Sequence, residues 1–270
     1  MATYKKRGYR KPKEKITDVV DNTTNDVEGY VEGESTTEEI FENLDDTANK
    51  VEEWAASNQK KIFMVVGAIA LCALLYMGYT KFVQEPKEAD AANAAYVAQD
   101  YFAKAVNATG TTQDSLFNLA LNGVNGKVGL VSIAENYSGT KAGNLANYAA
   151  GMAYLNMNDY KNAVSYLDNF SSEDEVFGAS AKGAIGDAYM QLSTAENPLL
   201  EDALSAYEKA LAATTNTYTT PKFLYKAAVV ALDLGKNDVA AKYLTQIKNN
   251  YASSLEAAKV DALLGKAQAK

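Results

Sequence analysis

The sequence offers few side chains for catalysis, since histidine is absent and Cys72 is the single cysteine. Imidazole general-base catalysis, Cys/His zinc sites and internal disulfides are therefore excluded. Acids cluster at Asp45–Asp46 and at Glu173–Asp174–Glu175, where a solvated face or a helix start accounts for them. Serine-hydrolase, P-loop and dinucleotide-binding motifs are absent. We therefore predict no catalytic residue, cofactor or metal ligand, and a protein that is not an enzyme.

Anionic ligands receive equally little support from the sequence. The stretch GVNGKVG at 123–129 has three glycines but lacks the strand–turn–helix context of a phosphate loop, so we predict a turn between helices. The formal charge of −8 argues against specific nucleic-acid binding, which needs a basic face.

The long apolar run KKIFMVVGAIALCALLYMGYTKF, residues 60–82, contains nineteen uncharged residues from Ile62 to Thr80. That length is close to the roughly 20 residues that a helix needs to cross a bilayer core. Tyr76 and Tyr79 near one end, and Trp54 beyond the other, suit membrane–water interfaces. The run therefore predicts a transmembrane helix at 60–82.

Three other interpretations of the run fit less well. A cleaved signal peptide begins within the first residues and has a shorter apolar core. A lipoprotein signal wants a small residue before its cysteine, whereas Leu71 precedes Cys72. A buried helix of a soluble domain seldom has so long a charge-free stretch. A single-pass anchor remains the preferred interpretation.

The chain before the run divides into three parts. Residues 1–15 carry seven Lys/Arg against one Glu, and residues 16–59 carry thirteen acids against Lys50 alone. We predict a basic, then acidic, disordered tail at 1–35 and an amphipathic juxtamembrane helix at 36–59, whose acidic face suits a protein partner better than anionic lipid. The basic start predicts a cytoplasmic N-terminus and a C-terminal region on the other side.

From residue 83 to 270 the sequence predicts an all-α tetratricopeptide-repeat solenoid. In NYAAGMAYLNMNDYKNAVSYLDNF, residues 147–170, Gly151 and Tyr154 are followed by Ala163, Leu167 and Phe170 at the tetratricopeptide spacing. The pattern recurs from Gly186, with five extra residues in its turn, and from Ala228. Residues 91–107 and 116–124 resemble a degenerate first unit, and residues 253–270 a closing helix.

The first helix of each repeat should line a concave surface that binds polypeptide. Methionine and tyrosine offer adaptable apolar contact, and amides and carboxylates satisfy peptide backbone groups. We predict a protein-binding groove formed by Tyr148, Met152, Asn156, Asp187, Met190, Gln191, Lys222, Tyr225, Val229 and Asp233.

About residues 48–270 resemble the YfgM-like ancillary subunits of the bacterial Sec translocon. The resemblance lies in EEW before the Lys-flanked anchor, the aromatic exit YMGYTKF, the helix AAYVAQDYFAKAV and repeats starting near GTKAGNLANYAAGMAYL. It implies a single-pass protein of the bacterial inner membrane, with periplasmic repeats that associate with the SecYEG channel and a periplasmic prolyl-isomerase-type chaperone. The arm 1–47 departs from the family pattern.

The features together predict a membrane-anchored repeat protein at the Sec translocon. It would bind the chaperone, emerging client polypeptides, or both. The alternative is a repeat scaffold of another envelope machine that serves secretion, outer-membrane assembly or division. An enzyme with an unrecognised site would instead need a deep pocket.

Overall fold

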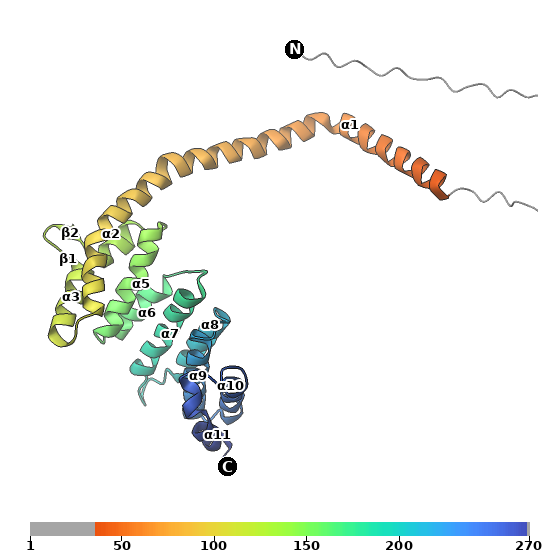
Figure 1. The fold of residues 1–270 in the computed structure, drawn as a ribbon. Helices are drawn as coiled ribbons and strands as arrows, with labels where there is room; N and C mark the ends of the chain where they lie inside the picture. The colour runs from red at the N-terminus through yellow and green to blue at the C-terminus, as the bar shows by residue number, and fades with distance from the viewer. Residues whose placement is uncertain (1–35, 269–270) are drawn as a thin grey trace, which may run out of the picture. The chain divides into compact units, whose positions relative to one another are not determined.

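A computed structural model describes residues 36–268, with side chains from Val51 onward, so the predicted tail at 1–35 lies outside the described residues. The described chain is all-α, as predicted, apart from one short hairpin (Figure 1). The elements are α1 (Thr36–Tyr79), π-helical η1 (Thr80–Gln84), α2 (Glu85–Val106), α3 (Gly110–Asn122), β1 (Gly123–Val124), β2 (Lys127–Val128), α4 (Leu130–Asn136), α5 (Lys141–Asn156), α6 (Tyr160–Asp168), α7 (Glu175–Leu192), α8 (Leu200–Ala212), α9 (Thr219–Asp233), α10 (Asn237–Asn250), 3-10 η2 (Glu256–Lys259) and α11 (Val260–Gln268).

The chain divides into two compact parts, with the boundary inside α1 between Ile69 and Ala70. The predicted juxtamembrane helix at 36–59 and residues 60–79 of the predicted transmembrane helix are both part of α1, with no helix break at residue 60, and residues 80–82 belong to η1. The helical stretch Val51–Val106 contains an eighteen-residue window of mean hydropathy 2.2, long and apolar enough to cross a membrane. None of that window is buried: Met64, for example, is 74% exposed and Leu74 is 66% exposed. The run is therefore not the core helix of the described fold.

The wider π-helical turn η1 begins at Thr80, within the last residues of the apolar run. Within it the backbone N–H of Glu85 donates to the oxygen of Thr80, five residues back. Pro86 comes next and has no N–H to donate, and its ring would crowd the carbonyl four residues earlier in a regular α-helix. A local widening before a proline relieves that crowding, so the helical path continues into α2.

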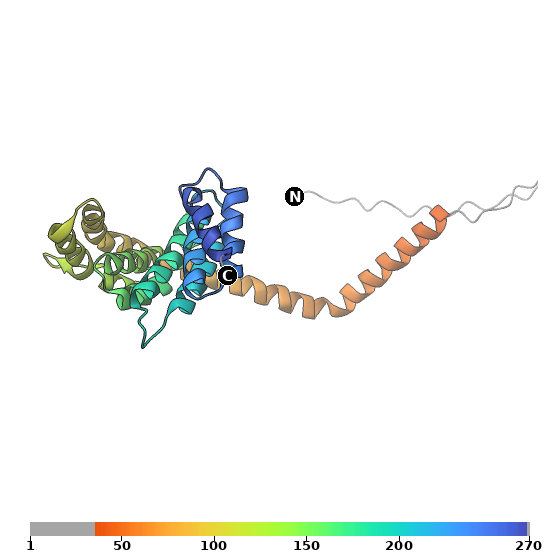
Figure 2. The ribbon, with the colours of Figure 1, turned by 90° about the horizontal axis from the view of Figure 1, so that it is seen from below.

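Helices α5–α6, α7–α8 and α9–α10 form three successive pairs, as the predicted repeats require. Each helix from α5 to α10 packs against the next along the chain, and α7 also contacts both α5 and α9. The pairs follow one another from green at α5 to blue at α10 (Figures 1 and 2). This neighbour pattern is that of a helical-repeat solenoid, with α5, α7 and α9 in one row.

The predicted small-to-large spacing marks the close contacts within each pair. A Cβ added to Gly151 would lie 2.5 Å from Cγ of Leu167, and one added to Gly186 would lie 2.6 Å from Cε1 of Tyr207. In the third unit, Ala228 and Leu244 are fully buried in one cluster. The tetratricopeptide spacing in the sequence therefore corresponds to real helix-to-helix packing.

The first repeat, formed by α2, α3 and the residues that follow, contains more elements than the sequence predicts. Instead of a simple turn, residues 123–129 form a hairpin in which Gly123 pairs with Val128, around Asn125 and Gly126 at positive φ. Two consecutive residues at positive φ are typical of a tight hairpin turn. The short helix α4 follows, and its buried Leu130 and Ile133 help fill the core of α2 to α5. Nothing in the sequence analysis predicted α4.

A carboxylate connects α2 to the repeats. Both oxygens of Glu88 accept the backbone N–H of Lys141, at 2.7 and 3.0 Å, at the start of α5. The Thr140 hydroxyl accepts the N–H of Gly143 in the same first turn. Two of the otherwise unpaired donors of this helix end are thus satisfied, and the negative charge lies at the favourable end of the helix dipole.

Two other sequence predictions concern acids and the C-terminal end. Asp174 caps α7, because its carboxylate accepts from the backbone N–H groups of Val176 and Phe177 at 2.8 Å each. Of the two predictions for residues 173–175, a solvated face or a helix start, the structure shows the helix start at Asp174, whereas the side chains of Asp45–Asp46 lie outside the described part. The predicted closing helix is divided into a loop, η2 and α11.

Replacing Gly151 with leucine should lower the free energy of unfolding by about 1–3 kcal/mol or more, because the new side chain would overlap Leu167. The matched control is Gly265→Leu in α11, where an added Cβ meets no atom within 4 Å. Removing that helix glycine should stabilise the protein slightly, by up to about 1 kcal/mol. Denaturant titration of the full chain in detergent micelles measures both. Equal stability of the Gly151 variant and the wild type would contradict the packing.

Candidate functional site

The ten predicted groove residues lie on α5, α7 and α9, the helices that share one row. None of the ten is fully buried. Asn156, Gln191, Lys222 and Asp233 are exposed, and the other six are half-buried. The structure therefore distributes them over one accessible row of helices. Seven of them belong to three local environments, and Asn156, Val229 and Asp233 lie outside these.

Tyr148 and Met152 on α5 form the first environment, which is mostly packing. Both lie against a buried cluster that contains Leu167 of α6 and Ala181 of α7. The Tyr148 ring lies 5.0 Å from the Phe170 ring and 5.5 Å, edge-on, from the Phe177 ring. Partial burial raises the pKa of Tyr148. Much of this tyrosine therefore holds two units together, which leaves only its remaining surface for a ligand.

The second environment is a shallow hollow on α7. Asp187, Met190 and Gln191 line it together with Leu155, Tyr160 and Tyr207, and its volume is about 440 Å³. Asn156, on the preceding repeat, is not among the lining residues. Its side-chain amide donates a hydrogen bond to the carbonyl of Met152 on the same helix, at 2.7 Å.

A polar triad, two members of which line this hollow, connects three successive helices. The Tyr207 hydroxyl of α8 donates to Oδ1 of Asp187 on α7 at 2.6 Å. Lys226 of α9 donates to both carboxylate oxygens, at 2.5 and 2.6 Å, and its amine lies 5.7 Å from the Tyr207 ring centroid. Burial, then the charge and hydrogen bond of Asp187, raise the pKa of Tyr207 well above its ordinary value. Asp187 is therefore a joint between repeats as well as a groove residue.

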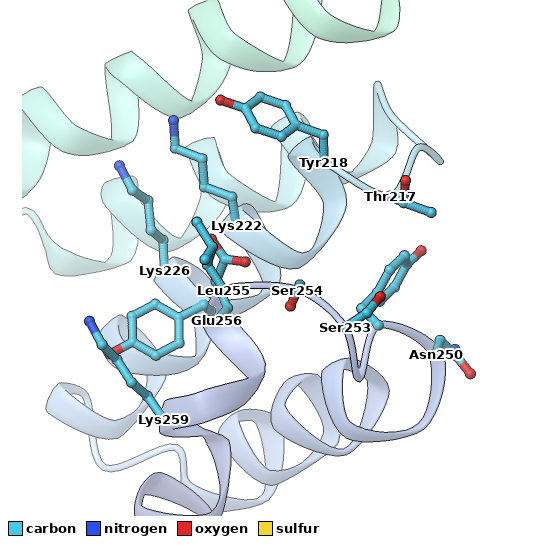
Figure 3. Close-up of a pocket in the computed structure, with 12 residues that line it drawn as sticks. Thr217, Tyr218, Lys222, Lys226, Asn250, Ser253, Ser254, Leu255, Glu256 and Lys259 are labelled. Carbon is cyan, nitrogen blue, oxygen red and sulfur yellow. The ribbon is translucent and has the colours of Figure 1, made fainter.

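The third environment, which we call the α9–η2 groove, is an open groove of about 760 Å³ between α9 and the segment that follows α10 (Figure 3). Of the predicted residues, Lys222 and Tyr225 line it, while Val229 and Asp233 lie further along α9 and do not. The remaining lining residues are Thr217, Tyr218, Lys226, Asn250, Tyr251, Ser253, Ser254, Leu255, Glu256 and Lys259.

Two apolar side chains of the α9–η2 groove are unusually accessible. Leu255 is 89% exposed and Tyr218 is 73% exposed. Neither residue was predicted from the sequence as a site residue, nor were Lys226 and Lys259. Helical spacing places Lys226 one turn after Lys222 on α9, so it could have been found. Leu255 and Lys259 belong to the segment that was assigned to a closing helix, and no local pattern indicates that it turns back toward α9.

The side chains of the described region do not form a metal site, since no group of three or more carboxylate or cysteine side chains there could hold an ion. The arrangement instead offers open, partly apolar surfaces with hydrogen-bonding groups, which suit a polypeptide better than a small molecule.

No model of a known protein family, no curated protein and no solved structure matches the chain. The resemblance to Sec-translocon ancillary subunits therefore rests on the residues quoted above.

Raising the pH should destabilise the fold partly through Tyr207. Because its pKa is higher in the folded than in the unfolded chain, its contribution is complete below the ordinary tyrosine pKa of 10 and is lost as the pH rises above it. The melting temperature should therefore fall from about pH 9 to about pH 11, and fall less in Tyr207→Phe, although that variant is less stable at neutral pH by about 1–3 kcal/mol.

The matched control for this pH series is Tyr96→Phe, since the Tyr96 side chain is 74% exposed. It should follow the wild-type curve at every pH. A parallel fall in all three proteins would show that Tyr207 does not carry the alkaline sensitivity.

Proposed function

We propose that this protein is a non-enzymatic, single-pass protein of the bacterial inner membrane that presents a helical-repeat domain in the periplasm beside the Sec translocon. The observation that carries the proposal is the order of the elements. An exposed, charge-free helix continues through η1 into α2, which packs as the first helix of the repeat domain.

The dimensions of the apolar run support the anchor. Nineteen residues in a helix extend about 28 Å, close to the roughly 30 Å hydrocarbon core. A helix satisfies its own backbone groups, as a lipid environment requires. Trp54, Tyr76 and Tyr79 are exposed near its two ends, where amphipathic rings meet headgroups. The uncovered apolar side chains therefore have a natural solvent in the bilayer.

The charge bias supports the orientation. Seven Lys/Arg in residues 1–15, with Lys60 and Lys61 beside the run, favour retention of the N-terminus in the cytoplasm. The repeats at 83–270 would then lie in the periplasm.

The repeat domain would act by holding other polypeptides. Accessible grooves on the α5, α7 and α9 row offer tyrosine, methionine, leucine, lysine and amide groups, a mixture suited to a weak and tolerant grip. An anchor raises the local concentration of such a site to roughly millimolar near its target. The ligands would be the prolyl-isomerase-type chaperone, polypeptides that emerge from SecYEG, or both.

The alternative is that the same anchored scaffold serves another envelope machine, in secretion, outer-membrane assembly or division. The order of an anchor followed by repeats is common to both candidates, which differ only in the partner complex. The resemblance of residues 48–270 to the ancillary subunits favours the Sec translocon.

Protease added to spheroplasts should degrade residues 81–270 and spare an epitope tag at the N-terminus, because the membrane shields the cytoplasmic side. Immunoblotting with tags at both ends measures this, and lysed spheroplasts, in which both tags should disappear, are the control. Protection of the C-terminal tag and loss of the N-terminal one would overturn the orientation.

Affinity purification of the tagged full chain in a mild detergent should recover SecYEG subunits and the prolyl-isomerase-type chaperone. Leu71→Arg with Leu74→Arg should abolish the recovery and release the protein from the membrane fraction, because each arginine near the bilayer centre costs about 2.5–3.5 kcal/mol. Leu71→Ile with Leu74→Ile, the matched control, should leave both unchanged. Recovery of a different envelope complex would favour the alternative.

A further inference from the structure

We propose that the α9–η2 groove binds an acidic polypeptide segment that carries apolar side chains. The inference rests on the proposed function, since it names the class of polypeptide that the repeat domain would hold. Figure 3 shows the side chains of Lys222, Lys226 and Lys259 extending to the same side of this groove. Glu256 is the one acid among the lining residues.

The charge of the groove contrasts with that of the chain. The whole protein carries a formal charge of −8, whereas the lining residues carry three lysines against Glu256. Asp187, outside the lining, neutralises Lys226. Neither Lys222 nor Lys259 forms an ion pair with any described residue. Two lysines without an ion pair therefore remain in the groove against one acid, Glu256, which leaves a positive charge for a ligand of opposite sign on a protein whose net charge is negative.

Helical geometry places Lys222 and Lys226 along one strip of α9, with Tyr218 at the N-cap of the same helix. Lys222 lies four residues after Tyr218 and four before Lys226, so the three project from neighbouring turns of one face. Like charges at that spacing destabilise each other unless they are compensated. Asp187 compensates Lys226, and an acidic ligand would do the same for Lys222.

The apolar part of the groove makes a peptide a better occupant than a free anion. Tyr218 and Leu255 are largely exposed although both are large and apolar, and each would lose water-accessible area against an apolar side chain. The Lys259 amine lies 5.7 Å from the Tyr225 ring centroid, so a charged group and an aromatic face are presented together. Ser253, Ser254 and Asn250 add backbone-bonding groups to the lining. The lysines, apolar side chains and hydrogen-bonding groups of the groove therefore suit a peptide in which acidic and apolar residues alternate.

The test uses the full chain in an uncharged detergent and a fluorescein-labelled peptide of repeating Asp-Leu-Glu-Phe, with binding measured by fluorescence anisotropy. The peptide should bind, and added salt should weaken the binding. Lys222→Glu with Lys259→Glu should raise Kd about tenfold or more, because repulsion replaces two attractive contacts. Leu255→Ser should raise Kd about fivefold with unchanged melting, because Leu255 has few contacts within the protein.

The matched control is Lys127→Glu with Lys242→Glu, which makes the same change of charge at two exposed lysines outside the groove. This variant should bind the peptide nearly as the wild type does. Equal loss in both double variants would mean that the peptide senses net charge rather than the groove, and would overturn the proposal.

A peptide of repeating Lys-Leu-Lys-Phe separates this inference from the proposed function. If the basic peptide binds the groove more tightly than the acidic one, the acidic preference is wrong while polypeptide binding stands. If neither binds, the groove proposal fails, and recovery of SecYEG by the full chain still decides the membrane partnership. Binding of phosphatidylglycerol vesicles that depends on Lys222 and Lys259, without peptide binding, would assign the groove to lipid and overturn the proposal.

Discussion

Close approach of helices at small residues underlies the arrangement of the repeat domain. Gly151 leaves space for Leu167 and Gly186 leaves space for Tyr207, so a large side chain of the second helix of a unit lies against the backbone of the first. The same device acts between units, where a Cβ on Gly183 of α7 would lie 2.0 Å from Cε1 of Phe223 on α9. The row α5, α7 and α9, and hence every surface on it, depends on these contacts, because a solenoid has no single central core.

Within one unit, the sequence alone was sufficient to predict the packing. Gly151 and Leu167 are sixteen residues apart, a separation set by two helices and a short turn, so local spacing determines which side chains meet. The contact between Gly183 and Phe223, and the bond from Lys226 to Asp187, join different units. They depend on the rotation of one unit against the next, which turn lengths and packing set together. The residue spacing within a repeat does not predict that rotation.

The candidate site was predictable to the same extent. The row of helices and the groove residues Lys222 and Tyr225 follow from the repeat spacing. Leu255 and Lys259 do not, because they reach α9 only after the chain turns at residues 251–255. The short helix α4 was missed for a related reason, since seven residues are too few to establish a helical period. Terminal units depart from a repeat pattern, and the unpredicted features lie mainly there.

The hydrogen bonds from the first residue of α5 to Glu88 join α2 to the repeats, and this connection has a mechanical consequence. From Thr80 to the first buried residue of α2, Ala91, the chain is helical throughout, and about eleven residues of helix extend only about 16 Å. In the proposed membrane setting, a short helix rather than a flexible linker would join the repeat domain to the membrane-spanning segment. A load applied to a captured chain would then reach the lipid-embedded segment through a continuous helix, without first extending a flexible linker.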